Sequence, residues 1–212
     1  MRDFLVFVHD HRFLKCAKTG EIGSAGRRIS SETFRAFSGF GMNIVVLARC
    51  CTVDTLGSDS IVLPNLEFKF IKGRSFAAAF SWRIFSNVVL IYNLIRPAAV
   101  VVLRLPSMLG VVAGSLCLLL RRPYFVEQVG DPKEALVPAL GGNSFFSRMI
   151  AAWFSFLNAW LARRATGVIY VTDHTLQRRF PCPGLQGAAS NVVVDVPTEC
   201  PKRVFFGMES TG

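Results

Sequence analysis

Short apolar runs of strand length recur along the chain, and segments with helical character separate them. The runs occupy residues 4–8, 44–48, 66–71, 100–103, 124–127, 167–171 and 191–196. Most of them are continuously apolar, which is typical of strands that are buried on both faces of a parallel sheet. Strands that alternate with helices predict an α/β fold with a doubly wound, mostly parallel, Rossmann-like sheet.

Helices are predicted between these strands at 31–39, 75–95, 107–120 and 144–165, and Asp173 is expected to cap a further short helix. Residues 10–30, in contrast, have the composition of a long polar loop. The helix at 144–165 is apolar nearly all round, so we expect it to be buried in the core. Contact with a membrane surface or a partner is the alternative for this helix.

The last residues of the sequence suggest the start of a second structural unit. After the strand at 191–196, a polar stretch leads to the apolar run 204–207, and the sequence ends at Gly212. A strand followed by glycine and small polar residues typically opens an α/β domain. We therefore expect one complete domain at 1–197, and a linker with the truncated first strand of another domain at 198–212.

A net charge of +10 is compatible with nucleic acid, an anionic membrane surface or phosphorylated small molecules as partners. No nucleic-acid-binding module is recognisable, so we expect no nucleic acid among the partners. Arginine pairs are placed mostly at predicted helix ends, where the helix dipole favours cations. The apolar runs are shorter than the roughly 20 residues of a membrane-spanning helix, and no signal peptide is evident. These features predict a cytoplasmic protein.

The cysteines and histidines do not form a recognisable metal-binding pattern. The six cysteines include no Cys-x-x-Cys pair, so they are expected to be reduced thiols. His9 and His11 flank Asp10, but a metal site there would need a third ligand that the sequence does not identify. We therefore expect no metal ion.

Polar side chains follow several of the predicted strands, and ligands of an open parallel sheet bind beyond the carboxyl ends of its strands. Asp10 and His11 follow the first strand, Arg104 follows the fourth, Glu127 ends the fifth, and Asp131 comes shortly after it. Glu127 is expected either to pair with Arg104 or to accept a hydrogen bond from a substrate hydroxyl, because an unpaired buried carboxylate is costly.

The glycine-rich segment at 23–28 is a second candidate site. Glycine allows the backbone to approach a ligand closely, and arginine binds phosphate in bidentate geometry. Ser24, Gly26 and Arg27 are therefore candidate phosphate contacts, although a flexible surface loop is an equal interpretation. The segment matches neither a Walker loop nor a dinucleotide-binding fingerprint.

Several segments together resemble a known family. They are Asp-His-Arg-Phe at 10–13, Gly-Ser-Ala-Gly at 23–26, Val-Val-Leu-Ala-Arg at 45–49, Leu-Arg-Leu-Pro-Ser at 103–107, and the stretches at 123–132 and 170–181. In this order and spacing they resemble the amino-terminal domain of bacterial GT-B glycosyltransferases of the family-four type, which build surface polysaccharides. The similarity runs from the first strand to about residue 196.

The resemblance implies two Rossmann-like domains that face each other across a cleft. The amino-terminal domain would bind the acceptor, and the carboxyl-terminal domain would bind the nucleotide sugar. Transfer would retain the anomeric configuration and need neither a metal nor another cofactor. Ser24, Gly26 and Arg27 would approach the donor phosphates. The acceptor site would be lined by Asp10, His11, Arg104, Glu127 and Asp131.

The resemblance also sets expectations for the chain as a whole. Its acceptor would be a saccharide or a lipid-linked acceptor at the inner membrane face. Peripheral contact with an anionic membrane is compatible with the net charge of +10. The donor-binding domain would be missing or separate, so we expect this chain alone to be inactive, and no catalytic residue is assigned. A non-catalytic acceptor-binding subunit of a split glycosyltransferase, or another Rossmann-like nucleotide-binding protein, are the alternatives.

Overall fold

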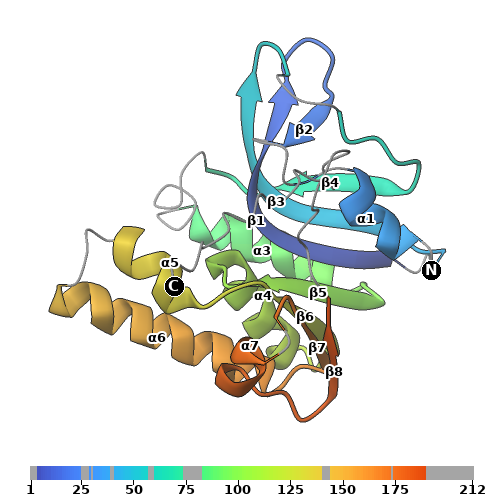
Figure 1. Cartoon of the computed structure of the whole chain (residues 1–212). Helices are drawn as coiled ribbons and strands as arrows, with labels where there is room; N and C mark the ends of the chain where they lie inside the picture. The colour runs from blue at the N-terminus through green and yellow to red at the C-terminus, as the bar shows by residue number, and fades with distance from the viewer. Residues whose placement is uncertain are drawn as a thin grey trace, which may run out of the picture.

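The computed structural model describes residues 4–24, 29, 31–38, 41–56, 60–73, 83–139, 144–172 and 174–189. These residues form one eight-stranded sheet flanked by helices (Figure 1). In spatial order the main strands are β4 (Leu66–Phe70), β3 (Asn43–Val53), β1 (Phe4–Cys16), β5 (Val100–Leu105), β6 (Tyr124–Gln128), β7 (Gly167–Tyr170) and β8 (Leu185–Ala188). All neighbours in this order are parallel, and β2 (Ile22–Ser24) pairs antiparallel with β1. The predicted fold class is confirmed.

The central strands are buried on both faces, as their continuous apolar character predicts. Successive side chains of a strand point to opposite faces of the sheet. Val6 and Val8 accordingly belong to one hydrophobic core, and Leu5 and Phe7 belong to another on the opposite face. A strand that contributes to two cores has few positions for polar side chains, which explains why its sequence is apolar without interruption.

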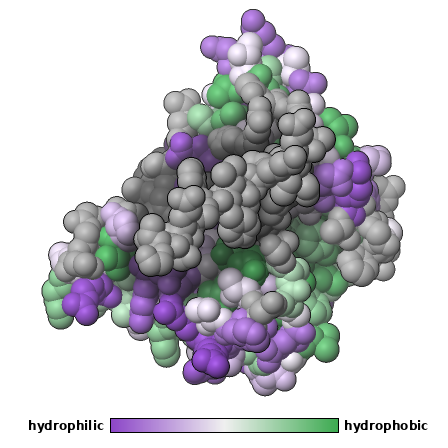
Figure 2. All heavy atoms as spheres, viewed as in Figure 1, coloured by the Kyte–Doolittle hydropathy of each residue, from purple (hydrophilic) through white to green (hydrophobic). Residues whose placement is uncertain are grey.

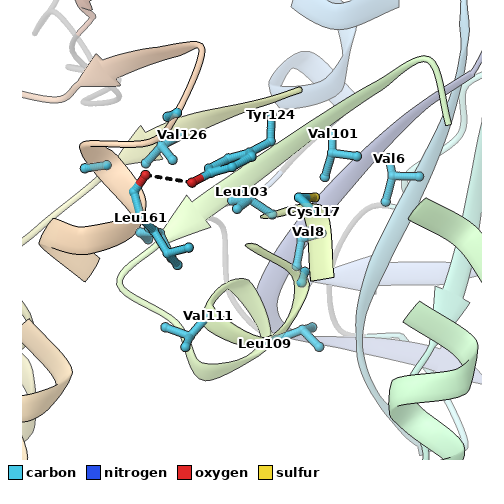
Figure 3. Close-up of a cluster of buried hydrophobic side chains, with 14 of the residues drawn as sticks. Val6, Val8, Val101, Leu103, Leu109, Val111, Cys117, Tyr124, Val126 and Leu161 are labelled. Atoms are coloured by element: carbon cyan, nitrogen blue, oxygen red, sulfur yellow. Dashed lines mark hydrogen bonds between the residues drawn. The ribbon is translucent and has the colours of Figure 1, made fainter. Parts of the chain in front are cut away.

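The larger core lies between the sheet and the helices α3 (Ile84–Ile95), α4 (Met108–Leu119), α6 (Phe145–Ala162) and α7 (Thr175–Arg179). Figure 3 shows part of it, including the buried Tyr124. The hydroxyl of Tyr124 donates a hydrogen bond to the carbonyl of Leu161 over 2.8 Å, which ties β6 to α6. On the other face, α1 (Ser31–Ser38) contributes Phe34, whose ring meets the ring of Phe7 edge-on.

Helix α4 approaches its neighbours so closely that one position has no room for a side chain. A Cβ atom on Gly114 would lie 2.8 Å from Cδ2 of Leu161 and 2.9 Å from Cδ1 of Leu103. Both distances are too short for carbon atoms in contact, whose optimum is about 3.5–4.0 Å. Gly114 therefore allows α4 to fit between β5 and α6.

The prediction of a polar loop over residues 10–30 is wrong for much of that segment, because strands occupy residues 10–16 and 22–24. Strand β1 continues to Cys16, and the chain turns through Gly20, at φ 75°, before β2 pairs back onto β1. The hairpin projects beyond the sheet together with the end of β3 (Figure 1). Polar residues obscured the strand pattern, because only Phe13 and Cys16 among residues 11–16 are buried.

Besides β2, two further elements were not predicted, and some predictions lie outside the described residues. Helix α5 (Pro132–Ala139) contains Pro138, and all four residues of β8 are exposed, so neither element carries a clear apolar period. The expected strand at 191–196, the linker and strand at 198–212, the cap Asp173 and the expected helical start at 75–82 are outside the part of the chain that the structure describes.

Helix α6 was expected to be buried in the core, but only one of its faces is buried. Phe154 and Leu161 lie in the core, but Phe145, Phe146, Met149, Trp153 and Phe156 are exposed to solvent. The prediction that the whole helix is buried is therefore wrong. Among the described residues, no helix combines the length and the apolar character that spanning a bilayer requires.

Candidate functional site

The sheet has a topological switch point between β1 and β5. From β1 the chain proceeds to β3 and β4 on one side, and it then crosses over to build β5 to β8 on the other. In such sheets, ligands bind at the switch point beyond the carboxyl ends of the strands. Six polar side chains gather along these strand ends, and we call them the switch-point rim: His9, Asp10, His11, Arg49, Arg104 and Glu127.

A β-bulge places the first three residues of the rim. Val8 pairs with Leu47 and Arg12 pairs with Arg49, so four steps along β1 match two steps along β3. The two extra residues interrupt the regular alternation of side chains between the two faces. Bulges of this kind commonly redirect side chains next to active sites. The predicted residues Asp10 and His11 lie within this irregularity.

His9 is a buried, neutral histidine, with 7% of its surface exposed. Burial, and secondarily the charges of Arg104 and His11, lower its pKa to about 3. Its Nδ1 atom accepts a hydrogen bond from the backbone N–H of His11 over 3.1 Å. The proton of the neutral ring must then reside on Nε2, because Nδ1 is the acceptor. Within the described part of the chain, that Nε2 group is buried without a hydrogen-bond partner.

Asp10 is held by a cation and by the amino terminus of α4. Arg49 Nε lies 2.6 Å from Asp10 Oδ1, and Arg49 also donates to the Asp10 backbone carbonyl over 2.7 Å. The backbone amides of Met108 and Leu109, at the start of α4, also act to lower the pKa of the carboxyl. Burial raises the pKa of Asp10, while Arg49 and these amides oppose the increase. The Asp10 carboxylate thus occupies the position that a helix terminus offers to anions.

Arg104 and Glu127 form the ion pair that was one of the two expectations for Glu127. One terminal nitrogen of Arg104 lies 3.1 Å from each carboxylate oxygen of Glu127. Direct pairing of β5 with β6 places the two residues opposite each other in the parallel ladder. The side chain of Arg104 is 21% exposed and that of Glu127 is 14% exposed, so both are only partly buried.

Ser24 is buried in β2, and its hydroxyl lies 3.0 Å from Nε2 of His11. The two residues join the hairpin to the rim. Gly26 and Arg27, the other members of the predicted phosphate-binding segment, lie outside the described residues. The phosphate contact stays a prediction for all three.

Asp131 lies apart from the ion pairs of the rim and organises the segment after β6. Its side chain is 3% exposed. It accepts a hydrogen bond from the backbone N–H of Lys133 over 2.9 Å at the start of α5, and it also pairs with Arg179 of α7. Asp131 therefore fixes the relative positions of two helices, and acceptor binding by this residue stays a prediction.

Two hollows are present among the described residues. One, of about 400 Å³, lies at the amino ends of β1, β3 and β4, where it is lined by Phe4, Asn43 and Leu66. The other, of about 610 Å³, is lined by residues of α5, with Asp131, Ser155 and Arg179. Only the second lies on the side of the sheet where parallel strands bind ligands, so it is the hollow that fits an extended site.

No group of three or more metal-ligating side chains occurs among the described residues, and the paired histidines of β1 bond to protein atoms instead. The cysteines of the described ranges, Cys16, Cys50, Cys51, Cys117 and Cys182, are free thiols. Burial raises the pKa of Cys117 to about 12, so this thiol is protonated at neutral pH.

Sequence reasoning missed His9 and Arg49 as members of the rim. The sequence placed His9 at the end of the first strand, directly after a continuously apolar run, but it was not assigned a ligand contact. Arg49 follows the apolar run at 44–48 in the same way. Its partner Asp10 is 39 positions away in the sequence, and no local pattern identifies such a pair.

Comparisons with known proteins give a partial match and a distant one. No protein-family model matches the chain. Protein CapJ of Staphylococcus aureus is 32% identical over 84 residues, which correspond to 40% of this chain and 21% of CapJ. The crystal structure of a UGT transferase from Siraitia grosvenorii in complex with UDP aligns with 84% of this chain and 47% of that chain, at 13% identity and a TM-score of 0.43. The chain therefore matches about a fifth of the length of CapJ.

Proposed function

We propose that this chain is the acceptor-side domain of a retaining GT-B glycosyltransferase that acts in surface polysaccharide synthesis. The enzyme would transfer a sugar from a nucleotide-sugar donor to a saccharide or lipid-linked acceptor without a metal ion. The motif order described above, the Rossmann-like sheet and the partial similarity to CapJ support a role in sugar transfer. The switch-point rim is the observation that carries the proposal.

The rim supplies the hydrogen-bonding groups that a hydroxyl-rich acceptor needs. The Glu127 side chain is partly exposed beside Arg104, so it can accept hydrogen bonds from sugar hydroxyls while the guanidinium balances its charge. The buried Nε2–H group of His9 is a donor with unused capacity among the described residues. These groups would bind and orient an acceptor, and positioning is a large part of catalysis in group transfer.

The placement of Asp10 supports an acceptor rather than a diphosphate at the switch point. A helix amino terminus is a common phosphate-binding site. In this chain the first amides of α4 already act on the Asp10 carboxyl, whose pKa they lower. A phosphate at the same place would have to displace this carboxylate and the associated Arg49. The donor diphosphate would therefore be bound elsewhere, by a second domain and by the segment of Ser24, Gly26 and Arg27.

The test is a comparison of saccharide and nucleotide binding by the full chain. Saturation-transfer NMR with oligosaccharide acceptor analogues should show contact, and Glu127→Gln should weaken it at least roughly tenfold, because the uncharged amide is a poorer acceptor. Glu67→Gln on exposed β4 is the matched control and should leave binding unchanged. Nucleotide sugars should bind weakly by calorimetry, and the chain should not turn them over.

Other results distinguish the alternatives. Tight binding of a nucleotide by this chain alone would favour another nucleotide-binding function and contradict the acceptor-side assignment. Sugar transfer by the purified chain would contradict its expected inactivity. If activity appears only after a separate donor-binding polypeptide is added, the split-enzyme alternative is correct.

A further inference from the structure

Helix α6 exposes a continuous aromatic face. Its members, which we call the α6 aromatic face, are each between 51% and 85% exposed: Phe145, Phe146, Met149, Trp153 and Phe156. At 3.6 residues per turn, all five lie within an arc of roughly 100°. They therefore form one stripe along the helix rather than scattered apolar positions. Figure 2 shows apolar side chains along the edge of the molecule where α6 lies, next to hydrophilic ones.

The buried face of α6 is less aromatic than the exposed one. It contains Ser147, Ala151, Phe154, Asn158, Leu161 and Ala162. The amide of Asn158 donates back to the carbonyl of Phe154 over 2.7 Å, as a polar side chain must when it is buried in a helix. Helices that only pack on a core direct their large apolar side chains inward. The distribution on α6 is the reverse, so packing within this domain does not account for its exposed aromatic residues.

The charges around the stripe are positive. The sequence of α6 contains no acidic residue, and its one charged residue, Arg148, is exposed. Exposed Arg163 and Arg164 follow at the carboxyl end, and the guanidinium of Arg164 lies 4.7 Å from the ring of Trp160. On neighbouring α5, Glu134 pairs with Arg179 over 3.3 Å, which balances its charge.

We propose that the α6 aromatic face binds the surface of a lipid bilayer that contains anionic headgroups, with the helix lying in the plane of the interface. Tryptophan and phenylalanine partition favourably into the boundary between headgroups and acyl chains. Arginines at both ends of the stripe would contact the phosphates of the headgroups, and the net charge of +10 adds attraction to an anionic surface.

The arrangement of charge argues against a second copy of the chain on this face. In a two-fold symmetric contact the same patch meets itself. If two α6 helices packed antiparallel, the contact would bring together Arg148, Arg163 and Arg164 of both copies, and α6 has no acidic residue to balance them. Like charges would therefore meet in the contact, whereas an anionic bilayer complements them.

The test is co-sedimentation of the full chain with phosphatidylcholine vesicles, with and without phosphatidylglycerol. The chain should bind the anionic vesicles, bind pure phosphatidylcholine at least roughly tenfold more weakly, and lose affinity as salt rises. Trp153→Glu should reduce binding to anionic vesicles at least roughly tenfold. Phe85→Glu is the matched control, because Phe85 is 79% exposed but lies on α3, away from the stripe.

Fluorescence gives a second readout that reports on insertion rather than on affinity. The chain contains Trp82, Trp153 and Trp160, so a Trp82→Phe, Trp160→Phe variant retains Trp153 as its only tryptophan. Brominated lipids should quench Trp153 when anionic vesicles are present, and its emission should shift to the blue. Circular dichroism should show native helix content in every variant that is compared.

Several outcomes would overturn the proposal. One is the absence of binding to anionic vesicles. Another is equal loss of binding in Trp153→Glu and Phe85→Glu, since both then act only through charge. Analytical ultracentrifugation that shows a dimer, lost in Trp153→Glu, together with no quenching by brominated lipid, would assign the face to self-association. The proposal is independent of sugar transfer, so failure of the saccharide-binding test would not affect it.

Discussion

The switch-point rim and the α6 aromatic face depart from the usual distribution of side chains in opposite directions. The rim buries ionisable groups, and α6 exposes large apolar ones. Both arrangements are unfavourable unless a partner compensates for them. At the rim the partners belong to the chain itself, because Asp10 pairs with Arg49 and Glu127 pairs with Arg104.

This difference indicates how each region relates to folding. The acidic side chains of the rim are paired within the chain, so removal of these pairs should affect stability as well as binding. The α6 aromatic face has no comparable role in the core, so its substitution should affect binding and leave folding unchanged. The predictions below test this distinction.

The largest difference in stability is expected between alanine substitutions on the two sides of α6. Phe154 is 7% exposed and Phe156 is 57% exposed, two positions apart on the same helix. Phe154→Ala should lower the free energy of unfolding by about 3–5 kcal/mol, because it leaves a cavity in the core. Phe156→Ala should change it by less than about 0.5 kcal/mol. Urea unfolding followed by circular dichroism measures both, and equal losses would mean that the aromatic face supports the fold.

The rim should make stability depend on pH through His9. The folded-state pKa of His9 is about 3, below its ordinary value of 6.5. Only the unfolded state takes up the proton between these values, so stability falls as pH decreases from 6.5 towards 3. The loss between pH 7 and pH 4 should be about 3 kcal/mol.

His9→Asn removes this contribution and retains an acceptor for the His11 amide. Unfolding free energies that are measured across the same pH range should therefore fall less steeply in the variant. Parallel pH profiles for the variant and the native chain would show that His9 is not the group responsible.

A buried ion pair should be costly to break from one side only. Arg49→Leu leaves the Asp10 carboxylate without its cation, and we expect a loss of about 2–3 kcal/mol, at the low end for buried pairs because both side chains are 18% exposed. Adding Asp10→Asn to this variant should recover part of the loss. If the double variant is as unstable as the sum of the two single variants, the two groups do not interact and the rim is not a network.

The smallest effects are expected at two helix caps, one in each region. The Ser107 hydroxyl accepts a hydrogen bond from Gly110 over 2.7 Å in a buried setting, and Ser144 accepts one from Ser147 over 3.1 Å at the exposed start of α6. Ser107→Ala should cost about 1–2 kcal/mol and Ser144→Ala about 0.5–1 kcal/mol. Thermal unfolding of the two variants gives the comparison, and the reverse order would contradict the distinction between the regions.

The sequence predicted the sheet more successfully than the site. Five-residue apolar runs such as 4–8 and 44–48 identified strands, because burial on both faces leaves a continuous apolar signal. The bulge at His9–His11 and the antiparallel hairpin left no such signal. Phe13 is buried, but Arg12 and Lys15 near it are exposed, and the mixture resembles a loop.

The side-chain pairs of the site depend on the register of strands, which local sequence does not contain. Arg104 and Glu127 were correctly expected as one possible pair, because both lie near the carboxyl ends of adjacent strands. The contact of Asp10 with Arg49 depends on two additional residues in the bulge, and that of Asp131 with Arg179 depends on how α5 and α7 pack. The exposure of α6 was missed because an apolar composition alone does not distinguish a core helix from one that meets another surface.

Strand β1 is a single covalent element that belongs to two different structures. Its first residues pair with both β3 and β5 in the middle of the sheet, whereas its last residues pair with the end of β3 and, antiparallel, with β2. The bulge at His9–His11 separates these two parts, so it lies between the centre of the sheet and the hairpin that β1 forms with β2. A ligand or partner that moved the hairpin would transmit that displacement along the backbone to His11 and His9. The backbone of β1 thus connects the hairpin directly to the switch-point rim.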